Sequence, residues 1–68
     1  MKADAIEVGS TYVCTSPILK KQFQGAVEKL YESSALVIVS QTEAIDAERS
    51  EELNNRLIVS FSSFESLV

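Results

Sequence analysis

The alternation of hydrophobic and polar residues predicts a β-hairpin over residues 23–39. Apolar side chains between residues 26 and 31 are followed by a polar cluster at residues 32–34 and then by an unbroken apolar run, Ala35–Val39. Three of the five residues in that run are β-branched, as strands prefer. The hairpin therefore turns at Glu32-Ser33-Ser34, and the chain is predicted to be mainly β.

Three further strands are predicted outside the hairpin, at residues 11–15, 56–61 and 64–68. In the first of them a period of two places Tyr12 and Cys14 on one face. Pro17 ends this strand, because proline has no N–H for a ladder. Residues 18–22 then form a loop that carries Lys20 and Lys21.

The predicted architecture is a small five-stranded antiparallel barrel formed by a single domain, residues 1–68, with residues 1–7 as a loosely ordered lead-in. Gly25 stands at the entry to the second strand, where glycine often marks a bulge or a tight bend. The alternation assigns these residues to the core: Val8, Tyr12, Cys14, Phe23, Val27, Leu30, Ala35, Val37, Val39, Leu57, Val59, Phe61 and Leu67.

Residues 42–54, TEAIDAERSEELN, have a different character, and two interpretations stay open for them. Good helix formers, no Gly or Pro, and Thr42 as an N-cap favour a short helix, whereas the acidic composition is equally typical of a mobile loop. In the helical interpretation Ile45 and Leu53 share one face. That face would cover Leu36 and Ile38, which point away from the core in a strand that is apolar on both sides.

Charge and composition narrow the classes of function. The formal charge of −4 arises within residues 42–54, where five acidic residues oppose Arg49 alone, and the rest of the chain balances. One cysteine, Cys14, and no histidine exclude a structural zinc site, and Cys14 is interpreted as a buried packing residue. We therefore predict no metal, no cofactor and no catalytic residue in a non-enzymatic protein.

The length of the apolar runs and the size of the chain predict its location and its stability. The longest apolar run is far below the ~18 residues that a membrane helix needs, so a cytoplasmic protein without a membrane partner is expected. A domain of 68 residues has a small core, and dimerisation would add to its stability.

The order of the segments resembles an SH3-like barrel, and more closely the KOW-like group of very small bacterial proteins of unknown function. The resemblance rests on Val8-Gly9, residues 25–30, the turn at 32–34, and Arg56–Ser60 leading through Phe61-Ser62-Ser63-Phe64. It implies a single helical turn between the last two strands, which suits the spacing of Phe61 and Phe64. The segments 16–22 and 42–54 are longer than a minimal barrel requires.

Two binding functions are compatible with this sequence. The first is a protein-interaction module, which would bind an unidentified partner or a second copy of itself through Leu36, Ile38, Ile45 and Tyr31. The second is a nucleic-acid binder, because KOW-type barrels include such proteins and a local basic and aromatic patch is available. A net negative charge disfavours the second by repelling a polyanion. That patch would comprise Lys20, Lys21, Lys29, Arg56 and Tyr12.

Overall fold

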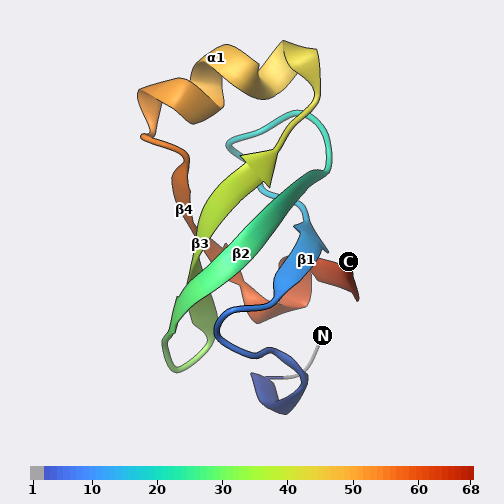
Figure 1. Ribbon diagram of the computed structural model, residues 1–68, viewed down its shortest axis with the longest axis vertical. Coiled ribbons are helices and arrows are strands. Elements are labelled where there is room, and N and C mark those ends of the chain that lie inside the picture. The colour runs from blue at the N-terminus through green and yellow to red at the C-terminus, as the bar shows by residue number, and fades with distance from the viewer. Residues whose placement is uncertain (1–2) are drawn as a thin grey trace.

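Five antiparallel strands in one sheet make up most of the structure, a computed structural model that describes residues 3–68 (Figure 1). The strands lie in the order β4-β3-β2-β1-β5, so the first strand of the chain lies between the second and the last. The mainly β, five-stranded prediction is confirmed. The elements are η1 (Ala3–Ala5, a 3-10 turn), β1 (Thr11–Cys14), β2 (Phe23–Leu30), β3 (Ser34–Gln41), α1 (Ala44–Glu52), β4 (Arg56–Ser60), η2 (Phe61–Ser63, a 3-10 turn) and β5 (Phe64–Leu67).

The predicted hairpin is the longest part of the sheet. Strands β2 and β3 pair with Val27 opposite Val37 and Leu30 opposite Ala35. The Tyr31 N–H donates to the Ser34 carbonyl at 2.8 Å and closes the turn. β3 begins at Ser34, so the last residue of the predicted turn cluster already belongs to the strand.

The pairing of β2 with β3 has two irregularities, one on each strand. The register shifts between Gln24 and Gly25, next to the glycine where a bulge or a tight bend was predicted, with Ser40 of β3 as the extra residue, and again between Val27 and Lys29. The second shift leaves Glu28 as an extra residue. Val27 and Leu30 therefore point to the same side of the sheet although they are three residues apart.

The core lies on the inner face of the sheet and includes all but three of the predicted residues. Val8, Leu30 and Leu67 are exposed instead. Val8 is at the corner of the turn closed by the Ser10 N–H and the Glu7 carbonyl, which also holds Gly9 at a φ of 94°. Leu30 is in the last pair of the hairpin and Leu67 is on the outermost strand, so neither has neighbours on every side.

Three buried residues replace them: Ile6, Leu19 and Phe64. Ile6 follows η1, and the nearby Tyr12 hydroxyl accepts from the Glu7 N–H at 2.9 Å and donates to the Ala5 carbonyl at 3.2 Å. These contacts attach residues 5–7 to the core. Of the lead-in predicted at residues 1–7, residues 1–2 lie outside the described residues.

The segment 42–54 contains a helix of nine residues, α1, which resolves the choice left open by the sequence. Its N-cap is Glu43, not Thr42, and no side chain caps it. Asn54 and Asn55 end it with φ values of 57° and 59°, a left-handed conformation that asparagine tolerates better than most residues.

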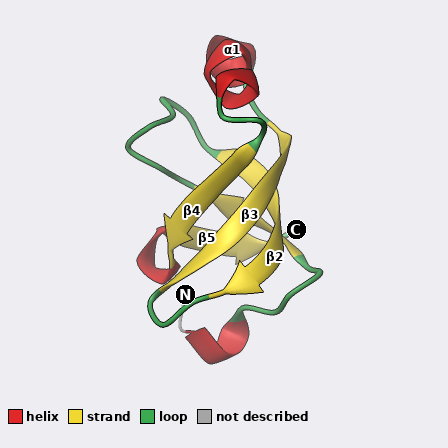
Figure 2. Cartoon of the chain, turned by 90° about the vertical axis from the view of Figure 1, so that its left-hand side faces the viewer, coloured by secondary structure: helices red, strands yellow, loops and turns green. Residues whose placement is uncertain are grey.

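The helix lies beyond the end of the sheet where β3 finishes and β4 begins, and it does not cover the sheet face (Figure 2). Ile45 is 58% exposed, so the prediction that it packs over Leu36 and Ile38 is wrong. Leu53 does pack against the core, at its edge. The outer face of β3 is left without the predicted cover.

A double-mutant cycle tests the close approach of β2 and β3 at Gly25. A Cβ placed there would lie 3.2 Å from both Cβ and Cγ2 of Val37. We expect Gly25→Ala to cost about 1–3 kcal/mol through overpacking and Val37→Ala to cost a similar amount through lost burial. Because Val37→Ala removes the crowding Cγ2 methyl group and keeps only Cβ, the double variant should lose less stability in urea unfolding than the sum of the two single variants. Strict additivity would contradict this packing.

Candidate protein-interaction surface

The orientation of α1 is set by a buried carboxylate. Asp46 is 2% exposed, and its two carboxylate oxygens accept hydrogen bonds from the backbone N–H groups of Lys20 and Lys21, both at 2.8 Å. The loop before β2 presents these donors because Leu19, one residue earlier, is inserted into the core. The carboxylate thus satisfies two donors that the loop would otherwise leave unpaired near the core.

A second polar connection fixes the other end of the helix. Ser50, one turn after Asp46, is also buried, and its hydroxyl donates to Oδ1 of Asn55 at 2.9 Å. The Asn55 N–H returns to the Ser50 carbonyl at 2.8 Å, and the Asn55 carbonyl accepts from the Val39 N–H of β3. The helix therefore buries a polar face, and the neighbouring Ile45, about 100° around the helix axis, is left in solvent.

The outer face of the sheet carries an uncovered apolar surface, which we call the outer patch: Ala26, Leu36, Ile38 and Ile58. Register places Leu36 between Ile58 of β4 and Lys29 of β2, and Ile38 opposite Ala26. Leu36, Ile38 and Ala26 are half-buried, whereas Ile58 is 56% exposed. No described helix lies over this face (Figure 2).

Charged and aromatic side chains border the outer patch. Nζ of Lys29 lies 5.5 Å from the centroid of the exposed Tyr31 ring. Nη1 of Arg56, on β4, lies 4.0 Å from Oε2 of Glu28, the extra residue of β2, so this ion pair reaches across β3 between Leu36 and Ile38. An apolar centre with a polar and aromatic rim is the usual composition of a protein-binding surface.

The structure brings together three of the four residues predicted for partner binding. Leu36, Ile38 and Tyr31 are on or beside the outer face, whereas Ile45 is on α1, away from them. Ile58 was missed. Since Leu57 and Val59 were assigned to the core, strand alternation alone would have placed Ile58 on the opposite face.

The residues of the predicted basic and aromatic patch lie in different surroundings. Tyr12 is buried, with its ring 5.4 Å from that of Phe64 in an edge-on arrangement, and cannot stack on a base. Lys20 and Lys21 lie on the loop held by Asp46. Of the cations named for nucleic-acid binding, Arg56 has an acidic neighbour and Lys29 lies against an aromatic ring.

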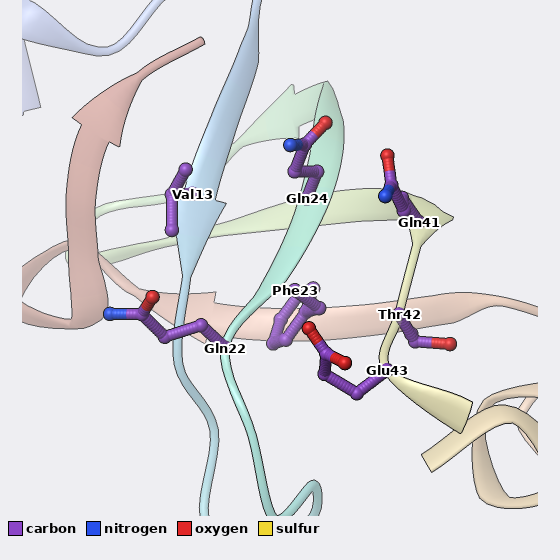
Figure 3. Close-up of a pocket in the computed structure, with 7 residues that line it drawn as sticks. All are labelled: Val13, Gln22, Phe23, Gln24, Gln41, Thr42 and Glu43. Carbon is purple, nitrogen blue, oxygen red and sulfur yellow. The ribbon is translucent and has the colours of Figure 1, made fainter. Parts of the chain in front are cut away.

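Two hollows lie near the end of the sheet that α1 caps. The first, of ≈ 160 Å³, has the side chains of Gln22, Gln24 and Gln41 around it, with Val13, Phe23, Thr42 and Glu43 (Figure 3). The second, of ≈ 430 Å³, lies between α1 and the end of β3. The first is smaller than the roughly 300–1,000 Å³ of typical ligand pockets. Amide and hydroxyl side chains line both hollows, each with a single carboxylate, Glu43 in the first and Glu51 in the second.

The one thiol is inside the core. Cys14 is fully buried, and burial, with a smaller contribution from the Glu65 carboxylate, raises the pKa of its thiol from 9.0 to about 11. This confirms the interpretation of Cys14 as a packing residue. Among residues 3–68 no three His, Cys, Asp or Glu side chains are grouped so that they could hold a metal ion.

Comparison of the chain with protein-family models, curated protein sequences and solved structures gave no match. Within the described part of the chain, no helix has the length and apolar character needed to cross a membrane.

Asp46→Asn tests the carboxylate that orients α1. The amide can accept from one of the two loop N–H groups but presents its own NH₂ to the other, so we expect a loss of about 1–3 kcal/mol in the free energy of unfolding. Glu48→Gln is the matched control, because it removes the same charge from an exposed position of the same helix. Equal stability of the two variants in urea unfolding would contradict the assigned role.

The raised pKa of Cys14 predicts a specific pH dependence. Above about pH 9 the thiol ionises in the unfolded chain but stays protonated in the folded one, so the unfolded state binds fewer protons and stability falls. Between pH 9 and about 11 we expect the wild type to lose up to about 3 kcal/mol relative to Cys14→Ala. Parallel stability curves for the two proteins across this range would refute it.

Proposed function

We propose that this chain is a non-enzymatic, SH3-like protein-interaction module of the small bacterial KOW-like type, which binds another protein through the outer patch. The observation that carries the proposal is the partly exposed apolar face of β3 and β4, where Leu36 is half-buried and its neighbour Ile58 is exposed. A domain this small has little apolar surface to spare, so an exposed cluster bordered by polar groups favours a binding role.

The topology supports the SH3-like part of the proposal. Strand β1 lies between β2 and β5, and the 3-10 turn η2 separates β4 from β5. This is the helical turn that the resemblance implied at Phe61–Phe64. The proposal places the module in the cytoplasm, where an unpaired thiol such as Cys14 is ordinary.

A pair of equally exposed isoleucines provides the test. Ile58 is 56% exposed in the outer patch and Ile45 is 58% exposed on α1, so Ile58→Thr and Ile45→Thr remove similar apolar surface from different places. In affinity capture from a bacterial lysate, we expect Ile58→Thr to reduce the bound partner at least tenfold. Ile45→Thr should bind as the wild type does.

Two outcomes would overturn the proposal. Equal capture by both variants would show that the partner binds elsewhere. Capture that is abolished by nuclease treatment and falls steeply with salt would show that nucleic acid is the ligand, since phosphate contacts are lost as salt rises.

A further inference from the structure

The outer edge of β4 is an unpaired strand edge. β4 ends the sheet, and no described strand lies beyond it. Hydrogen bonds of the residues just before and just after β4 in the chain, Asn55 and Phe61, show which backbone groups of the strand point outwards. The Val39 N–H donates to the Asn55 carbonyl, and the Phe61 N–H donates to the Ser33 carbonyl at 3.2 Å.

Antiparallel ladders alternate, so the backbone groups of every second residue face the neighbouring strand. Asn55 and Phe61 fix the phase, and Leu57 and Val59 therefore use their N–H and C=O groups towards β3. Ile58 and Ser60 direct theirs away from the sheet. The Arg56 carbonyl points the same way, whereas the Arg56 N–H is engaged by the Leu53 carbonyl at 3.2 Å.

This edge has few of the features that usually prevent strand pairing. Natural edge strands are protected by lysine, proline, bulges or inward-pointing charges. β4 contains none of these, since its sequence is RLIVS and its pairing with β3 is regular from Ser34–Ser60 to Ile38–Arg56. The only charge of the strand is at its first residue.

We propose that a second copy of this chain occupies the edge, with the two β4 strands antiparallel and centred on Ile58. In this register the Ile58 N–H and C=O groups of the two copies bond each other, and each Ser60 N–H donates to the Arg56 carbonyl of the other copy. The edge is complementary to itself in this register, because the Arg56 carbonyl, whose own N–H is already engaged, meets the outward-pointing Ser60 N–H. The two guanidinium groups are at opposite ends of the contact. The two Ile58 side chains meet on the outer face.

The dimer is expected to be weak. Interfaces that persist at low concentration usually bury about 800 Å² per partner, and an edge of five residues offers less. A dissociation constant between about 10 μM and 1 mM is therefore expected. The inference goes beyond the proposed function, since its test needs no partner protein.

Ser60→Pro is the decisive variant. Ser60 has a φ of −61°, which matches the φ that proline requires, and its N–H faces outwards, so the fold loses no ladder bond. The substitution removes the donor to the second copy and places a ring at the edge. Ser60→Ala is the control, because both variants lose the contact between the Ser60 and Ser62 hydroxyls while alanine keeps the N–H.

Sedimentation equilibrium from about 10 μM to 1 mM should show the mass of the wild type and of Ser60→Ala rising from 7.5 kDa towards twice that value. Ser60→Pro should stay monomeric, with its dissociation constant raised at least tenfold, and circular dichroism should show it folded. A wild type that is monomeric at 1 mM, or a Ser60→Pro variant that is folded and dimerises equally, would overturn the proposal. Assemblies larger than dimers would also overturn it, because they require head-to-tail pairing with another edge such as β5.

Discussion

The rest of this structure depends on the pair of hydrogen bonds between the Asp46 carboxylate and the backbone of Lys20 and Lys21. Both oxygens are used at 2.8 Å, in a setting where water reaches only 2% of the residue. A buried carboxylate without these donors would be strongly unfavourable, so the loop and the helix must adopt their positions together. Burial of Leu19 in the core and the inward orientation of Asp46 and Ser50 on α1 are both compatible with this interaction. The helix consequently caps the end of the sheet, and the outer face is left open.

The inner face of the sheet carries the buried core, which includes the aromatic cluster of Tyr12, Phe61 and Phe64. The one α-helix of the described residues could have covered the outer face or capped the sheet end, and its polar contacts favour the second position. The position in which α1 is held therefore leaves the apolar outer surface without a helix over it.

The sequence predicts those parts of the structure that repeat with a simple period. Alternation located all five strands and most of the core, and Gly25 lies beside a real shift of register.

The sequence pattern failed where a tertiary contact overrode it. Ile45 looked like the buried residue of α1 because it is apolar, yet Asp46 is buried instead, and a sequence gives no sign that one carboxylate in an acidic segment meets two loop amides. The burial of Leu19 was missed because its loop has no periodic pattern. The burial of Val8 was overestimated because Val8 precedes a turn at a glycine. On the candidate surface, alternation found Leu36 and Ile38 and could have found Ile58.

Strand β4 connects the two binding properties inferred for this protein. Its side chains at Arg56, Ile58 and Ser60 point out of the sheet plane, whereas the backbone groups of Ile58 and Ser60 point along that plane. A strand added to the β4 edge therefore forms its hydrogen bonds in the plane of the sheet. The outer face, which is perpendicular to that plane, stays accessible. Pairing two copies would join their outer patches at Ile58 and enlarge the apolar surface available to a partner, so association along the edge and binding on the face reinforce each other. The acidic excess is confined to residues 42–54, and α1, which contains most of it, lies beyond the end of the sheet (Figure 1). Repulsion between two chains of charge −4 is screened beyond about 8 Å at physiological salt, so it opposes pairing of the β4 edges only weakly.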